Sequence, residues 1–225
     1  MKNRKMIIPA IIAQTQKELD EHLIKVEGYS ELVQLDIMDG IFVPNNSLDF
    51  DFDVSGSNIS FEAHLMITDP MVWIEKNWWK VGTIIVHFES GQNPEDIIRF
   101  VKDKGKKIGF AISPETAVHN VKPYLDDIDQ LLIMTVNPGS YGSKFLPGTL
   151  SKISEARKLK PNLDIEIDGG VTPDTIKLIN DATNLRESAK SADRPLNYHP
   201  QIPQIFADGG SLLLHNFMLK LMTVH

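Results

Sequence analysis

Short apolar runs alternate along this chain with segments of helical periodicity. Seven runs predict buried strands, at Met6–Ile12, Leu32–Asp36, Ile59–Leu65, Thr83–His87, Lys107–Ile112, Gln130–Val136 and Asp164–Asp168. Many are continuous rather than alternating, which is typical of parallel strands that are covered on both faces. The pattern therefore favours a parallel sheet over an antiparallel one.

The segments between these runs carry helix-start signals. Thr15 can cap a helix over residues 16–26. Three more helices are expected where a cap residue precedes proline, at Asp69-Pro70, Asn93-Pro94 and Thr172-Pro173. Strands that alternate with helices predict an α/β fold, here a (β/α)8 TIM barrel that forms one domain over residues 1–225.

Two segments break this rhythm. Between Asn45 and Ile59 no helix fits, so the second crossover is expected to be shortened. The aspartates at 49, 51 and 53 are spaced like the start of a calcium loop, but the required glycine and glutamate are missing, so a solvated loop is expected. Residues 183–204 are polar and contain three prolines, which is typical of a loop or insert.

The eighth strand is the least certain element of the pattern. After residue 204 the stretch "IFADGGSLLLHNFMLKLM" predicts strand eight, a Gly-Gly turn and helix eight. The alternative is a strand over 184–188, which is shorter and more polar. The eighth strand is therefore expected in an irregular region.

Composition narrows the class of protein. A formal net charge of −7 argues against a nucleic-acid surface, which needs clustered Lys and Arg. The absence of Cys fits a reducing cytosol, and no segment has the run of apolar residues that a membrane helix needs. The N-terminal apolar run, which Pro9 interrupts, reads better as a first strand than as a signal peptide. We therefore expect a cytoplasmic protein.

Polar residues cluster where the strands end, and barrel active sites lie at the C-terminal ends of the strands. These residues are Gln34, Asp36, Asp39, Glu62, His64, His87, Glu166 and Asp168. His87 alone is best explained as a core residue, and Asp39, before Gly40, as a cap of backbone N–H groups in a turn. Asp36, His64 and Asp168 come from three strands and form a plausible N/O ligand set for a divalent metal.

Glycine-rich turns follow the late strands, as "NPGSYGSK", "DGG" and "ADGGS". Glycine lets backbone N–H groups approach an anion, and barrels often bind phosphate near strands seven and eight. A phosphorylated substrate is therefore expected.

Five stretches resemble the ribulose-phosphate 3-epimerase family and occur in its order over about residues 6–180: "LDIMDGIFVPN", "AHLMITDP", "IIVHFES", "LLIMTVNPGSYGSKF" and "IEIDGGV". The resemblance implies a barrel that binds a pentulose 5-phosphate and a divalent metal ion (Zn, Fe or Mn). It implies that Asp36 and Asp168 are the paired acid and base, and that His64 binds the metal with them. Epimerisation at C3 would then pass through an enediolate that the metal stabilises.

The same resemblance implies a set of substrate contacts. Three methionines would line the site beside the reacting carbons: Met38, Met66 and Met134. Residues of the glycine-rich turns would contact the substrate, chiefly on its phosphate side: Gly139, Gly142, Ser143, Gly169, Gly170, Gly210 and Ser211.

Two residues depart from the family pattern. Gln34 stands where the family has a metal-binding His, and Ala10 stands where it has a substrate-contacting Ser. Gln34 can still offer a carbonyl oxygen as a weaker fourth ligand. Three functions stay open: this epimerase, a related epimerase of another ketose phosphate, or a sugar-phosphate binder with impaired catalysis.

Three tryptophans fall within one short stretch, at Trp73, Trp78 and Trp79. Not all of them can face the barrel. Core packing with one partly exposed ring is one explanation, and a contact between subunits of a homo-oligomer is the other, because Trp is enriched at interfaces.

Overall fold

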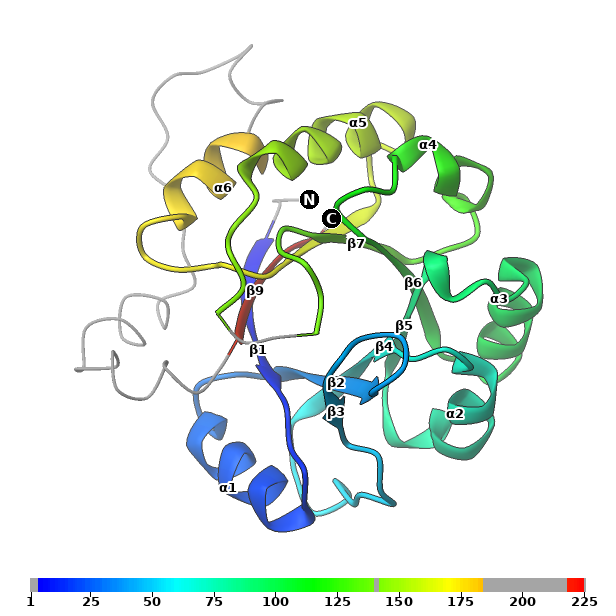
Figure 1. Cartoon of the computed structure of the whole chain (residues 1–225), viewed down its shortest axis with the longest axis vertical. Coiled ribbons are helices and arrows are strands. Elements are labelled where there is room, and N and C mark those ends of the chain that lie inside the picture. Colours follow the sequence, from blue (N-terminus) through cyan, green and yellow to red (C-terminus); the bar gives the residue numbers. More distant parts are fainter. Residues whose placement is uncertain (1–3, 140–141, 184–217, 225) are drawn as a thin grey trace.

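The computed structural model describes residues 4–139, 142–183 and 218–224 (Figure 1). Seven strands of these residues run parallel to one another: β1 (Arg4–Ile11), β2 (Leu32–Asp39), β4 (Ser60–Met66), β5 (Thr83–His87), β6 (Lys107–Ile112), β7 (Gln130–Met134) and β8 (Asp164–Asp168). All seven predicted strands are confirmed, three of them with identical bounds. No helix in the described part is long and apolar enough to cross a membrane.

The eighth position of the barrel is filled by β9 (Met218–Val224), which runs antiparallel to both β1 and β8. Pairing of β1 with β2 closes the sheet, so that no barrel strand has an unpaired edge. A helix was expected at the C-terminal end of the chain, and for Met218–Met222 this expectation was wrong. A short apolar run has no distinctive period, and pairing with two neighbouring strands decides its conformation. The expected strand eight near residue 205 and its alternative over 184–188 lie outside the described residues.

Helices lie around the outside of the barrel (Figure 1). They are α1 (Gln16–Val26), α2 (Pro70–Asn77), α3 (Pro94–Asp103), α4 (Val118–Val121), α5 (Ser151–Leu159) and α6 (Ile176–Thr183). Short 3-10 helices are η1 (Trp78–Lys80), η2 (Phe88–Ser90), η3 (Lys122–Tyr124) and η4 (Pro147–Leu150). The predicted caps Thr15, Asp69 and Asn93 each accept a hydrogen bond from a backbone N–H of the first turn. The helix expected from Pro173 begins later, at Ile176, after a turn in which Thr172 bonds Thr175.

The second crossover is short, as predicted. Between β2 and β4 the chain forms only β3 (Asn46–Ser47), paired antiparallel with the end of β2, and a loop. Phe52 and Val54 of this loop are buried in the outer hydrophobic layer, the cluster that contains strand residues such as Leu35 and helix residues such as Leu19. Asp51 forms an ion pair with Lys80 at 2.7 Å. Phe52 and Val54 thus cover the outer face of the sheet at the place where a crossover helix would otherwise pack.

The tryptophan-rich stretch divides between the core and the surface. Trp73 and Trp78 are partly buried and pack against the outer hydrophobic layer. Trp79 is 58% exposed, so it is the ring that remains available to solvent or to another protein.

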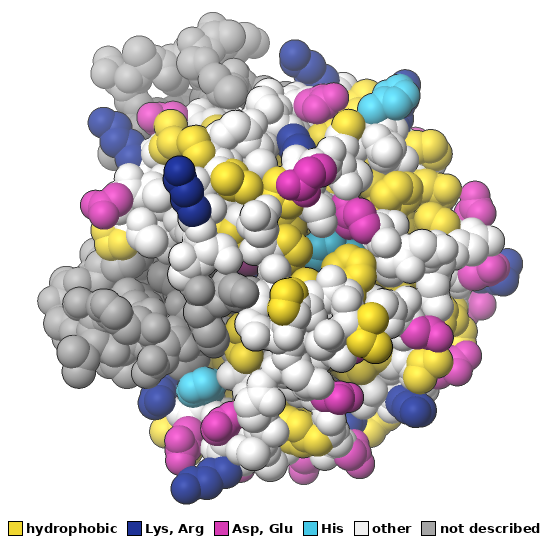
Figure 2. All heavy atoms as spheres, viewed as in Figure 1, with side chains coloured by type: hydrophobic (Ala, Val, Ile, Leu, Met, Phe, Trp, Pro, Cys, Tyr) yellow, Lys and Arg dark blue, Asp and Glu magenta, His cyan; other side chains and the backbone are white. Residues whose placement is uncertain are grey.

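Two loops lie over the centre of the barrel in the view of Figure 1, one after β2 and one after β7. They touch where Asn45 donates a hydrogen bond to the carbonyl of Gly139 and where Val43 approaches Gly139. Figure 2 shows the same face, with hydrophobic side chains over the middle and Lys and Arg mostly toward the rim. The loops close the end of the barrel at which β2, β4 and β8 finish.

Candidate active site

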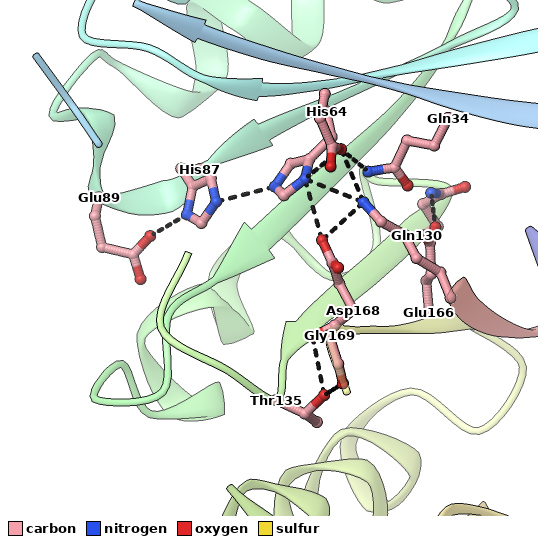
Figure 3. Close-up of polar contacts among 11 residues, drawn as sticks. Gln34, His64, His87, Glu89, Gln130, Thr135, Glu166, Asp168 and Gly169 are labelled. Carbon is pink, nitrogen blue, oxygen red and sulfur yellow. Dashed lines mark hydrogen bonds and ion pairs between the residues drawn. The ribbon is translucent and has the colours of Figure 1, made fainter. Parts of the chain in front are cut away.

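The barrel interior brings together the three residues that the sequence placed at strand ends. Asp36 of β2 lies opposite His64 of β4 in the parallel register, and Asp168 ends β8. His64 Nδ1 lies 3.2 Å from Asp168 Oδ2 (Figure 3) and 3.4 Å from Asp36 Oδ1. The three side chains are at most 2% exposed, and one ligand atom from each lies within 4.8 Å of the others. By donor type and spacing, this cluster could hold a metal ion.

Lys220 of β9 is a fourth member of the cluster. Its Nζ lies 2.9 Å from Asp36 Oδ1, 2.8 Å from Asp168 Oδ2 and 3.4 Å from His64 Nδ1. The side chain is fully buried. The antiparallel register sets it opposite Asp168 on one side and Ile8 on the other. Sequence reasoning missed this residue; the available signal was a single Lys inside the apolar run "MLKLM".

Charges within the cluster stabilise one another. Burial alone would raise the pKa of Asp168, but the ammonium of Lys220 and the hydrogen bond with His64 hold it well below its usual range. Burial would lower the pKa of Lys220, but the charges of Asp168 and Asp36 raise it above its ordinary value. For His64, burial and the Lys220 charge lower the pKa, and hydrogen bonds with the two aspartates raise it more. The cluster is thus a buried network of ion pairs.

Gln34 contacts the cluster as a hydrogen-bond donor. Its Nε2 donates to Asp36 Oδ1 at 2.9 Å, while its Oε1 is buried without a partner among the described residues. In the register of β1 and β2, Gln34 lies opposite Ala10. The two departures from the family pattern are therefore neighbours inside the barrel.

Several buried oxygens of the site have no partner in the described part of the chain. They are Asp36 Oδ2, Asp168 Oδ1 and Gln34 Oε1. Buried polar atoms are nearly always hydrogen-bonded, and unpaired ones mark places where a ligand or water completes the structure. Each aspartate thus has one oxygen held by the cluster and one oxygen without a partner among the described residues.

A chain of hydrogen bonds leads from the cluster toward solvent. His64 Nε2 lies 2.9 Å from His87 Nε2, and His87 Nδ1 lies 3.0 Å from Glu89 Oε2 (Figure 3). Burial lowers the pKa of His87. Burial would raise the pKa of Glu89, but hydrogen bonds from His87 and others lower it to about 2. His87 is therefore a bonded core residue that also connects His64 to the partly exposed Glu89.

A second carboxylate pair lies deeper in the barrel. Glu62 and Glu166 precede His64 and Asp168 by two residues on the same strands, and Gln130 Nε2 donates to Glu166 Oε2 at 3.2 Å. Burial raises the pKa of Glu62 to about 7, despite the nearby Lys220. Burial and the charge of Glu62 raise the pKa of Glu166 as well. Both carboxyl groups therefore hold their protons to a higher pH than Asp168 does.

Asp39 caps a turn, as predicted. Its Oδ1 accepts hydrogen bonds from the backbone N–H groups of Ile41 and Phe42, and its Oδ2 accepts two from Thr68. Phe42 in turn packs its ring against His87, with centroids 5.0 Å apart. Asp39 therefore shapes the loop after β2 rather than joining the cluster.

The methionines of the predicted substrate site are buried in the same interior. Met38 and Met66 lie opposite each other in the register of β2 and β4 and share one apolar cluster with Val43. Met134 lies opposite Asp168 in the register of β7 and β8. Met38 and Met66 thus lie two residues after Asp36 and His64 on their strands, and Met134 lies beside Asp168.

The predicted glycines adopt conformations that other residues rarely take. Gly139, Gly142, Gly169 and Gly170 all have positive φ. A Cβ on Gly169 would come within 2.3 Å of Val136, and Thr135 Oγ1 donates to the Gly169 carbonyl at 2.5 Å (Figure 3). Ser143 is partly exposed in the loop after β7, and two predicted contacts, Gly210 and Ser211, lie outside the described residues.

Comparison with known proteins agrees with this geometry. A sequence model described as "Ribulose-phosphate 3 epimerase family" matches residues 6–185. Ribulose-phosphate 3-epimerase of Bacillus subtilis is 34% identical over 187 residues, which cover 78% of this chain and 86% of that protein. The Schizosaccharomyces pombe protein of that name is 30% identical (78% and 81% covered), and the Mycobacterium tuberculosis protein 33% identical (76% and 78% covered).

Proposed function

Because this chain belongs to the ribulose-phosphate 3-epimerase family and is an epimerase-type isomerase, we propose that it interconverts D-ribulose 5-phosphate and D-xylulose 5-phosphate. The observation that carries the proposal is the pairing of Asp36 and Asp168. Both carboxylates contact the same Nζ atom, and each keeps one oxygen without a partner among the described residues.

Inversion at C3 requires two proton-transfer groups on opposite sides of one carbon. One aspartate removes the C3 proton, which is acidic because the C2 ketone is adjacent, and the other returns a proton to the opposite face. The free oxygens Asp36 Oδ2 and Asp168 Oδ1 are the atoms that we assign to these transfers. The aspartate that acts as the acid therefore starts the turnover protonated, and proton exchange with water after product release returns the pair to its starting state.

Negative charge develops on the C2 oxygen of the enediolate. In this chain a cation, the ammonium of Lys220, already lies between the two carboxylates. The methionines Met38, Met66 and Met134 are buried on the strands that carry the cluster, and apolar surroundings that exclude water strengthen electrostatic interactions.

A phosphate would be bound on the side of the late strands. We assign it to backbone N–H groups of the loops after β7 and β8, around Gly142, Gly169 and Gly170, with Ser143 as a hydroxyl donor. The positive φ of these glycines turns the backbone sharply, as anion-binding loops require.

A divalent ion fits this site only in part. The donor types of Asp36, His64 and Asp168 suit Zn²⁺, Fe²⁺ or Mn²⁺. With Lys220 Nζ 2.8–2.9 Å from the same carboxylates, however, an ion at ligand distance from them would have to share space with a second positive charge. The metal ion stays a prediction, and we derive no step through it.

The proposal is tested by proton exchange. Incubation with D-ribulose 5-phosphate in D₂O, followed by NMR, should show deuterium at C3 and the formation of D-xylulose 5-phosphate. Asp36→Asn and Asp168→Asn should each abolish the formation of D-xylulose 5-phosphate, and the variant that lacks the base facing the C3 proton should also lose deuterium exchange. Glu166→Gln is the matched control: it alters a buried carboxyl group on the same strand that favours its protonated form, and it should leave exchange largely intact. Exchange that survives both aspartate substitutions would contradict the assignment.

A second candidate function is sugar-phosphate binding without turnover. It is favoured by the ion pairs of both carboxylates with Lys220 and by the adjacent Gln34 and Ala10. Thermal stabilisation by D-ribulose 5-phosphate without any C3 exchange would support it, and a panel of other pentulose and hexulose phosphates separates it from a related epimerase.

A further inference from the structure

We propose that the ammonium group of Lys220 is the resident cation of this site and replaces a divalent metal ion. The first argument is position. Nζ contacts all three members of the cluster that could hold a metal, at 2.9 Å from Asp36, 2.8 Å from Asp168 and 3.4 Å from His64. A metal ion would lie about 2.1 Å from the same ligand atoms. It could not be there together with the ammonium, because the two would overlap in space and repel each other.

The second argument is the occupancy of lone pairs. Asp36 Oδ1 accepts from both Lys220 Nζ and Gln34 Nε2, each at 2.9 Å. Asp168 Oδ2 lies 2.8 Å from Lys220 Nζ and 3.2 Å from His64 Nδ1. Each carboxylate oxygen has about two lone-pair sites. The two oxygens nearest the cluster's centre are thus filled by N–H donors, which leaves no lone pair there for a metal.

The third argument is the role of Gln34. At a metal centre this position would contribute a ligand oxygen, but here the amide nitrogen faces Asp36, and the amide oxygen has no partner among the described residues. The amide N–H of Gln34 and the ammonium of Lys220 both donate to Asp36 Oδ1. An amide that donates is therefore compatible with a carboxylate whose charge an ammonium neutralises. Gln34 and Lys220 therefore belong to one hydrogen-bonded arrangement.

Lys220 lies outside the part of the chain that matches the family. The family match ends at residue 185, so β9 lies beyond it. The antiparallel register of β9 fixes Lys220 opposite Asp168, and a slip of one residue in that pairing would take Lys220 out of register with Asp168. The strand that closes the barrel is thus also the one that delivers the cation.

The consequence for catalysis rests on the proposed function. The ammonium keeps its three protons throughout and only donates hydrogen bonds, two to the aspartates and one available to the C2 oxygen of the enediolate. The proton that leaves C3 goes to one aspartate, and the other aspartate supplies the proton to the opposite face. No metal ion or other co-reactant takes part, so turnover should not need an added metal.

Metal binding tests the proposal without reference to turnover. Tag-free protein is incubated with Mn²⁺, Zn²⁺ or Co²⁺, desalted and measured by inductively coupled plasma mass spectrometry. We expect well under one ion per chain for wild type and about one for Lys220→Met. Lys80→Met is the control, because Lys80 is also buried and ion-paired, but with Asp51 outside the site, and it should bind as little as wild type. One ion per wild-type chain, or none in a folded Lys220→Met, would overturn the proposal.

Folding and turnover complete the test. If Lys220→Met does not fold by itself, refolding in Mn²⁺ or Zn²⁺ should restore its circular dichroism spectrum, and failure with every ion would count against the proposal. With substrate, exchange by wild type should survive EDTA, whereas Lys220→Met without metal should lose about 100-fold or more. Loss of wild-type exchange in EDTA would overturn metal independence. If wild type shows no exchange under any condition, the proposed function fails, while the metal stoichiometry still decides the role of Lys220.

Discussion

Replacing Lys220 with Met should destabilise the fold strongly, because it leaves two aspartates buried without their counter-ion. The aliphatic stems of Lys and Met are alike in length, so the change removes charge rather than volume. Removal of one partner from a buried ion pair costs about 3–5 kcal/mol. Both Asp36 and Asp168 lose their closest cation here, and each is almost completely buried, which favours the upper part of that range.

Neutralising Asp36 and Asp168 as well should remove most of the destabilisation caused by Lys220→Met. The triple variant Lys220→Met, Asp36→Asn, Asp168→Asn removes both aspartate charges together with the ammonium. Its free energy of unfolding should therefore be only about 1–2 kcal/mol below that of wild type. Replacement of a whole buried ion network by neutral groups is often close to neutral. The non-additivity of the three changes measures the coupling between them.

Urea unfolding followed by circular dichroism, with equal m-values required for comparison, gives these differences. Lys80→Met is again the matched control: its partner Asp51 is 98% exposed at the side chain and keeps its hydration, so the ion pair itself contributes about 1 kcal/mol or less. The reasoning is refuted if Lys220→Met unfolds within 1 kcal/mol of wild type, or if the triple variant is no more stable than the single one.

Three further outcomes are expected. The pKa of Glu62 is raised to about 7 in the folded state, so the free energy of unfolding should fall as the pH rises from about 4.5 to 7. In urea unfolding at a series of pH values, Glu62→Gln should make this fall smaller. An unchanged dependence on pH would contradict the prediction. Gly169→Ala should cost more than Gly142→Ala, about 3 against about 1 kcal/mol, because both have positive φ but only Gly169 would clash; equal losses would refute the steric argument. Gln34→His in the Lys220→Met background should tighten Zn²⁺ binding at least about 10-fold by calorimetry, and unchanged affinity would show that residue 34 does not reach the ion.

The sequence predicted the buried cluster because its residues lie within strands that could be recognised locally. A carboxylate or an imidazole inside a continuous apolar run is costly without a partner, so Asp36, His64 and Asp168 were conspicuous. Their strands were predicted nearly to the residue, since parallel strands covered on both faces give unbroken apolar runs. The cap at Asp39 followed from an equally local rule about turns.

Lys220 could not be found in that way. Its run "MLKLM" fits a helix or a strand equally well, and the choice depends on whether the edges of β1 and β8 are free to pair with it. Whether its side chain points inward depends on the register of that pairing, which is a property of two distant strands.

The amino-acid sequence by itself predicted seven strands, three of the four helix caps, the family and the three side chains of the buried cluster, because each depends on neighbours along the chain. Only the tertiary structure decided the direction of the closing strand, the donor role of Gln34 and the ammonium between the two aspartates. These depend on residues far apart in sequence that a closed sheet brings within hydrogen-bond distance, where burial makes the pairing of every charge obligatory.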